Sequence, residues 1–134
     1  MDGTTTKLEM NAIGIVTADM PKSLEFYGLL DLNVPAYDPS QDHFDCELPN
    51  GLRIMWDTVE LVKGFMPGYV HGSGSGIGFA FQCASPAGVD AVYERVIAAG
   101  FSGSNPPWDA FWGMRYAILT DPDGNAVSLY ALLG

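Results

Sequence analysis

The two halves of this chain repeat one order of sequence signals, and this internal duplication constrains the fold more than any other feature. Displacing the sequence by 65 residues places Pro21 on Pro86, and displacing it by 73 residues places Gly51 on Gly124. Self-similarity of this kind predicts two copies of one supersecondary unit that pack together.

In the first half, the β-branched stretch at 11–17 predicts a strand. Asp19 can accept a hydrogen bond as a helix N-cap, and Pro21 fits the first helical turn, so a helix is expected next. Three short strands should follow, at 34–37, 43–48 and 52–57.

The second half repeats this order after a glycine-rich connector at 64–76, which we expect to be flexible. A strand is expected at 76–83, followed by a helix that Ser85 caps and Gly100 ends. Irregular chain through Pro106 and Pro107 should then lead into the last elements. These are two strands at 112–120 and 126–132, joined by the turn 121–125.

The predicted fold class is therefore α+β, with two tandem βαβββ modules that form a curved mixed sheet. The 134 residues suit one domain, in which module 1 covers about 8–63, a linker about 64–75 and module 2 about 76–134.

Charge and composition narrow the classes of partner. The formal net charge is −10, so the chain should repel a nucleic-acid backbone. No apolar run is long enough to span a membrane, and residues 2–10 lack the apolar core of a secretory signal. The two cysteines make no disulfide framework, so the expected location is the cytoplasm.

Three segments together resemble the vicinal oxygen chelate superfamily. They are the end of the first strand at 18–20, the helix segment 23–27 and the hairpin Asp-Pro-Asp-Gly-Asn at 121–125, placed in this order within a duplicated unit. That superfamily includes glyoxalase I, extradiol dioxygenases, fosfomycin-resistance enzymes and bleomycin-resistance binding proteins. The resemblance covers nearly the whole chain and implies a homodimer, with pockets near the subunit interface and strands that can be exchanged.

The resemblance also implies where a divalent metal would bind. Superfamily enzymes hold it with His, Glu or Gln side chains from the first and last strand of each module. Here those positions carry Ala12, Met55, Ile77 and Ser128. Catalytic divalent ions prefer oxygen or imidazole donors, which this set almost lacks. We therefore expect no metal, no cofactor and no catalytic residue of the usual kind.

Strand alternation predicts what fills the concave face instead. If the 121–125 turn closes a hairpin, Tyr116 lies opposite Tyr130 and Ile118 lies opposite Ser128. The segment 107–113 adds three large aromatic side chains as a lid or wall. The candidate ligand-binding residues are His43, Asp45, Met55, Asp57, Phe79, Phe81, Trp108, Phe111, Trp112, Met114, Tyr116, Ser128 and Tyr130.

Such a face suits a flat, aromatic ligand, and the negative field favours a cationic one. The leading hypothesis is a non-catalytic protein, closest to the metal-free drug-binding resistance proteins, that sequesters an aromatic antibiotic or antitumour compound. A bleomycin-like, mitomycin-like or enediyne-like natural product would fit.

Two alternatives stay open. An enzyme of this fold, such as a lyase, would use a non-standard site around His43, with Asp45 or Glu47, for proton transfer or to hold an unusual metal. A lone histidine on a strand is more often a rim residue, so we do not assign His43 a catalytic role. A scaffold or regulatory subunit would keep the pocket empty.

Overall fold

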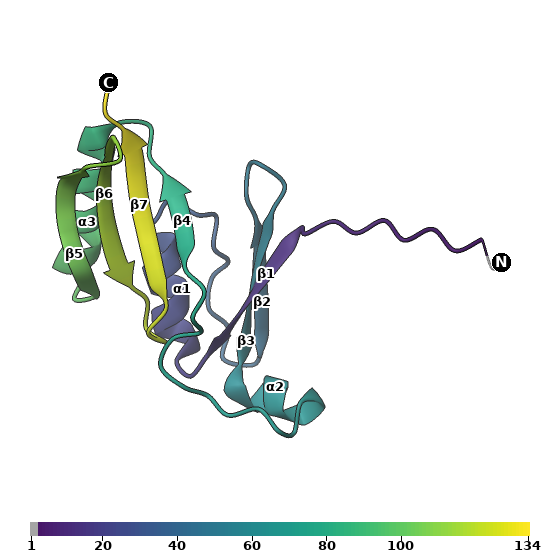
Figure 1. Ribbon diagram of the computed structural model, residues 1–134. Helices are drawn as coiled ribbons and strands as arrows, with labels where there is room; N and C mark the ends of the chain where they lie inside the picture. Colours follow the sequence, from purple (N-terminus) through teal and green to yellow (C-terminus); the bar gives the residue numbers. More distant parts are fainter. Residues whose placement is uncertain (1–2) are drawn as a thin grey trace.

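Two β-sheets, one from each half of the chain, form the body of the computed structural model, which describes residues 3–134 (Figure 1). Residues 1 and 2, part of the polar N-terminal stretch, lie outside the described residues. The first sheet has the order β1 (Ala12–Thr17), β3 (Arg53–Thr58), β2 (His43–Glu47). The second has the order β4 (Phe79–Gln82), β7 (Ala126–Leu132), β6 (Met114–Thr120), β5 (Ser102–Ala110).

The helices begin where the sequence places caps. The Asp19 carboxylate accepts the backbone N–H of Lys22 at the start of α1 (Met20–Gly28), as predicted. The Ser85 hydroxyl accepts the N–H of Gly88 at the start of α3 (Pro86–Ala98). These are the predicted helices of the two modules, and the mixed α+β class is confirmed.

Three elements differ from the prediction. Residues 34–37 form no strand; Pro35 there has no N–H to give to a ladder. A short helix, α2 (Val59–Phe65), follows β3 because Thr58 caps the N–H of Leu61. The stretch expected to be irregular is β5, which tolerates Pro106 and Pro107 as an edge strand with irregular register.

The hydrophobic core lies between the sheets and helices α1 and α3. Trp56, Tyr27 and Phe26 are its largest fully buried side chains, joined by Leu119 and Leu129 from the second sheet. Figure 1 shows α1 and α3 behind the second sheet, whose front face no helix covers. One face of each sheet therefore builds the core and leaves the other available for binding.

The β6–β7 register is the predicted one. Tyr116 lies opposite Tyr130 and Ile118 opposite Ser128, because the turn pairs Thr120 with the residue after Asn125. The alternation along β7 is equally regular: Val127 and Leu129 are buried, and the residues between them are more accessible.

The register of β4 corrects the predicted face of two candidate residues. Phe79 pairs with Val127 and Phe81 with Leu129, so both phenylalanines share the core-facing side of the sheet. They pack against the core cluster, whereas Ala80 and Gln82 lie on the face of Ser128 and Tyr130. The error is one residue: Gly14 matches Ala80, a displacement of 66 and not 65.

The connector is docked and does not run free. The N–H of Gly74 donates to the carbonyl oxygen of Asp123 over 2.8 Å. A Cβ at Gly74 would lie 3.0 Å from the carbonyl oxygen of Gly124, and Gly74 has a φ of +78°, so glycine permits this close approach. The glycines expected to give flexibility therefore hold the connector on the turn.

Within residues 3–134, every helix is too short or too polar to cross a membrane.

Candidate functional site

Four aromatic side chains cluster on the uncovered face of the second sheet, and we call them the aromatic wall: Trp108, Trp112, Tyr116 and Tyr130. Tyr116 is the centre of the cluster. Its ring centroid lies 5.5 Å from that of Trp108, 5.4 Å from that of Trp112 and 6.3 Å from that of Tyr130. Strands β5, β6 and β7 bring these residues together, as the predicted face requires.

The wall is accessible. Trp112 lies in the turn between β5 and β6 with 46% of its surface exposed, and Phe111 beside it is 96% exposed. The rings of Phe111 and Trp112 meet edge to face at 5.0 Å, so Phe111 forms the rim of the wall. Met114 and Ser128 are half-buried on the same side of the sheet. A single chain thus presents an open aromatic surface and not a closed pocket.

The corresponding face of the first sheet is charged. His43 on β2 lies opposite Asp57 on β3, and Met55 lies opposite Asp45. The Nδ1 atom of His43 is 2.5 Å from Asp57 Oδ1, and its Nε2 atom is 3.1 Å from Asp45 Oδ2. The predicted acidic margin therefore forms, with the imidazole held between two carboxylates.

This arrangement favours the protonated form of His43. Carboxylates only accept hydrogen bonds, so both ring nitrogens can be satisfied only when both carry a proton. The hydrogen bond to Asp57, together with that to Asp45, raises the pKa of His43 against the opposing effect of desolvation. An imidazolium has no free lone pair and is poorly suited to act as a general base.

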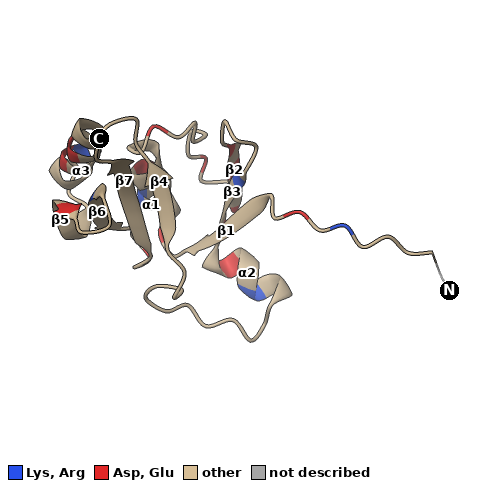
Figure 2. Cartoon of the chain, turned by 45° about the horizontal axis from the view of Figure 1, so that its top comes forward, with Lys and Arg blue, Asp and Glu red and all other residues tan. Residues whose placement is uncertain are grey.

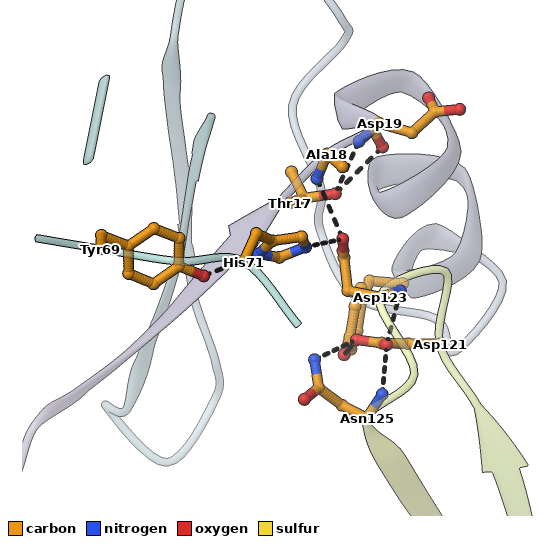
Figure 3. Close-up of polar contacts among 9 residues, drawn as sticks. Thr17, Ala18, Asp19, Tyr69, His71, Asp121, Asp123 and Asn125 are labelled. Carbon is orange, nitrogen blue, oxygen red and sulfur yellow. Dashed lines mark hydrogen bonds and ion pairs between the residues drawn. The ribbon is translucent and has the colours of Figure 1, made fainter. Parts of the chain in front are cut away.

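A second polar cluster, which the sequence did not reveal, joins the connector to the 121–125 turn. His71 Nε2 is 2.9 Å from Asp123 Oδ1, and the Tyr69 hydroxyl is 2.7 Å from His71 Nδ1. Figure 3 shows His71 between Tyr69 and Asp123. The N–H of Ala18, at the end of β1, also donates to Asp123 Oδ1 over 2.9 Å. The cluster thus unites three distant segments.

The turn that carries Asp123 is itself firmly anchored. Asp121 Oδ1 accepts the backbone N–H groups of Asp123 and Asn125, and Asp121 Oδ2 accepts the Tyr27 hydroxyl of α1 over 2.7 Å. Burial and the Asp121 carboxylate raise the pKa of Tyr27 far above its usual value, so Tyr27 stays a donor. The turn therefore fixes the position of Asp123.

Only weak sequence signals pointed to this cluster. His71 is one of two histidines, and it stands two residues from Tyr69 in a glycine-rich segment. Residues two apart share a side in extended chain, but nothing in the spacing indicates that they meet Asp123, which lies 52 residues away from His71.

Comparison with known proteins identifies the family. The sequence model described as Glyoxalase/Bleomycin resistance protein/Dioxygenase superfamily matches residues 9–129. The chain belongs to this superfamily. No curated protein sequence matches it significantly.

Solved structures of the superfamily share the fold. A glyoxalase/bleomycin resistance protein/dioxygenase from Nocardioides is 27% identical, with 98% of this chain and 87% of that chain covered and a TM-score of 0.74. A glyoxalase-related enzyme from Fulvimarina pelagi is 19% identical over 92% of this chain and 87% of that one, with a TM-score of 0.80. A glyoxalase/bleomycin resistance protein/dioxygenase family enzyme from Burkholderia phytofirmans PsJN is 17% identical, with 94% of this chain and 100% of that chain covered and a TM-score of 0.77.

The side chains at the four metal-ligand positions of superfamily enzymes do not suit a divalent metal in this chain. The strand register moves one of the four expected positions from Ile77 to Gly78, which has no side chain. Ala12, Met55 and Ser128 occupy the other three and supply one thioether and one hydroxyl. Within residues 3–134, no group of three or more His, Cys, Asp or Glu side chains is placed to hold a metal ion.

Proposed function

We propose that this superfamily member is a non-catalytic binding protein that sequesters an aromatic, cationic small molecule. An antibiotic or antitumour natural product of the bleomycin, mitomycin or enediyne type is the expected class of ligand. The observation that carries the proposal is the aromatic wall, an accessible cluster of four rings on a sheet face that lacks the metal donors of superfamily enzymes.

The wall can supply enough binding energy. Covering about 200 Å² of apolar ligand surface gives on the order of 5 kcal/mol at roughly 25 cal/mol/Å², before the cost of association is subtracted. The rings of Trp108 and Trp112 meet Tyr116 at 66° and 81°, which leaves edges and faces open to a flat ring system. Free ligand would fall by mass action as the complex forms.

Charge supports a cationic ligand. The net charge is −10, and the strands that carry Tyr130 and Ala80 are themselves uncharged (Figure 2). Figure 2 also shows acidic residues on β5 and α3, of which Asp109 and Asp90 are ion-paired with Arg115 of β6, so the attraction for a cation comes from the net charge of the whole chain. An uncharged aromatic surface inside an acidic field attracts cations and stacks them.

A homodimer would complete the site. The wall is open in one chain, and a second copy could close it into a cleft. Residues 3–11 extend away from β1 (Figure 1), and this arm carries Leu8 and Met10 with 96% and 82% of their surface exposed. Exposed apolar side chains on such an arm favour contact with another chain.

A fluorescence titration with a panel of aromatic cations and quinones tests the proposal. Trp56 is fully buried, so quenching by a ligand reports mainly on Trp108 and Trp112. We expect saturable quenching and at least tenfold weaker binding in Trp112→Ala, with the recovered ligand unchanged in mass.

Tyr37→Ala is the matched control, because Tyr37 is a 45% exposed aromatic residue outside the wall. Equal losses in Tyr37→Ala and Trp112→Ala, no quenching by any compound, or a chemically altered ligand would each contradict the proposal.

A further inference from the structure

A cavity of about 320 Å³ lies beside the docked connector, away from the aromatic wall. Tyr69, His71 and Asp123 line it on one side. Val16, Val70 and Phe79 give it an apolar part. The cavity thus combines a polar cluster with a surface that can hold a small ring.

The hydrogen bonds in the cluster have a fixed direction when His71 is neutral. Asp123 can only accept, so His71 Nε2 carries the proton and donates to it. His71 Nδ1 must then accept the hydroxyl proton of Tyr69. Every proton of the chain is committed, and the Tyr69 oxygen is left with free lone pairs. The cluster therefore offers the cavity an acceptor.

Asp123 is suited to stabilise a positive charge on His71. Only 4% of its side chain is exposed, and its Oδ2 atom is buried without a hydrogen-bond partner among the described residues. A buried carboxylate with an unused oxygen is costly, and an adjacent imidazolium lowers that cost. His71 Nδ1, which already accepts the hydrogen bond of Tyr69, is thus the atom to which a proton can pass.

We propose that this cavity binds a small molecule with an acidic hydroxyl group, a phenol or an enol, and that the Tyr69–His71–Asp123 chain removes its proton. The ligand O–H donates to Tyr69 Oη. As the ligand proton moves to Tyr69, the hydroxyl proton of Tyr69 moves to His71 Nδ1. The products are a ligand oxyanion, an unchanged Tyr69 and an imidazolium paired with Asp123.

Tyr69 conducts the proton and does not keep the charge. Desolvation and the nearby Asp123 carboxylate raise the pKa of Tyr69, so its phenolate is unfavourable. A proton that leaves Tyr69 must therefore be replaced from the ligand. This site is independent of the aromatic wall, because none of its lining residues belongs to the wall.

The test uses 4-cyanophenol, whose phenolate and neutral forms absorb at different wavelengths and whose pKa lies well above the ordinary histidine value of about 6.5. The full chain is titrated into the probe about one pH unit below the pKa of the free probe, where about a tenth of the probe is ionised and an ordinary imidazole is still mostly neutral. We expect a saturable phenolate band with one probe per chain and about a fivefold rise in the ionised fraction of the probe bound in the cavity.

His71→Gln is the most discriminating variant. Its amide can keep the hydrogen bonds with Tyr69 and Asp123 but cannot take the proton. We expect it to bind the probe in equilibrium dialysis without the phenolate band. Tyr69→Phe should lose the band and weaken binding. Trp112→Ala and His43→Asn should leave the band unchanged, which separates this site from the aromatic wall and from the other histidine.

Thermal melts of each variant exclude loss of folding as the cause. The proposal is overturned by the absence of saturable binding to the unmodified chain, by binding without the phenolate band, or by a band that survives in folded His71→Gln.

Discussion

Strands β1-β3-β2 of the first sheet repeat the order and directions of β4-β7-β6 in the second sheet, which adds β5, yet the uncovered faces of the two sheets have different chemistry. In the first sheet that face holds His43 between Asp45 and Asp57. In the second sheet the equivalent strands hold Tyr116 and Tyr130, with stacked rings. The core-facing sides remain alike: Trp56 of β3 and Leu129 of β7 occupy equivalent positions, 73 residues apart, and both are fully buried.

The difference shows which of the two alternating sets of strand positions the fold requires to be apolar. Core-facing positions must stay apolar because they pack against α1 and α3. The other positions do not build the core, so they can carry an ion cluster in one module and an aromatic surface in the other. Function should therefore depend on the uncovered faces, and stability on the covered ones.

The largest expected effect is on the free energy of unfolding, and it distinguishes a tryptophan on a covered face from one on an uncovered face. Trp56→Ala should lower the free energy of unfolding by about 3–5 kcal/mol, because the side chain is fully buried. Trp112→Ala should lower it by less than about 1 kcal/mol, because the residue is half-exposed. Urea denaturation measures both, and equal losses would refute the division between the two faces.

The next effect concerns the turn that holds Asp123. Asp121→Ala should destabilise the chain by about 1.5–3 kcal/mol, since it leaves buried N–H groups and the Tyr27 hydroxyl without their acceptor. Tyr27→Phe removes only one of these bonds and should cost less. If Tyr27→Phe costs as much as Asp121→Ala in denaturation, the turn does not depend on its internal bonds.

A third change separates the two uncovered faces in binding. Tyr130→Ala should weaken an aromatic cation at least tenfold, about 1.4 kcal/mol, with little loss of folding. Asp45→Asn, on the first sheet, should change the affinity much less. Isothermal titration of both variants checks this, and a larger loss in Asp45→Asn would place the ligand on the charged face.

A smaller effect is the pH dependence that His43 adds. The folded state raises its pKa above the ordinary value of about 6.5, so its ion pairs stabilise the protein fully below that pH. This stabilisation is lost as the pH rises through the raised pKa. The difference in unfolding free energy between the unmodified chain and His43→Asn should be larger at about pH 5.5 than at about pH 8.5. A difference that grows with pH would contradict the imidazolium assignment.

The last prediction concerns a substitution that should leave the activity of the protein unchanged. Ser128→Glu restores one oxygen donor, but Ala12, Met55 and Gly78 still supply no usual ligand for a divalent ion. We expect no glyoxalase turnover with added divalent metal. Measurable turnover in this single variant would show that the metal site needs fewer donors than we infer.

The sequence predicted the parts of the fold that depend on local signals. Asp19 and Ser85 mark the starts of α1 and α3, and the 121–125 turn sets the pairing of Tyr116 with Tyr130. Local chemistry determines caps and tight turns, so these residues suffice. The places of Trp112, Tyr116 and Tyr130 in the aromatic wall followed from that register, whereas Trp108 joins the wall through β5, which the sequence did not predict.

The failures involve tertiary contacts. The face of Phe79 depends on where β4 pairs with β7, and the sequence before it is glycine-rich and gives no fixed register. β5 exists despite two prolines because it is an edge strand. The His71 cluster requires the connector to dock on the turn, which no local pattern indicates.

Native mass spectrometry of the chain with the tightest-binding aromatic cation tests the central claim most directly. We predict a complex whose added mass equals that of the intact ligand, and loss of that complex in a Trp112→Ala, Tyr130→Ala double variant that still folds. A ligand of altered mass, or equal occupancy of the double variant, would contradict an aromatic wall that binds without transforming.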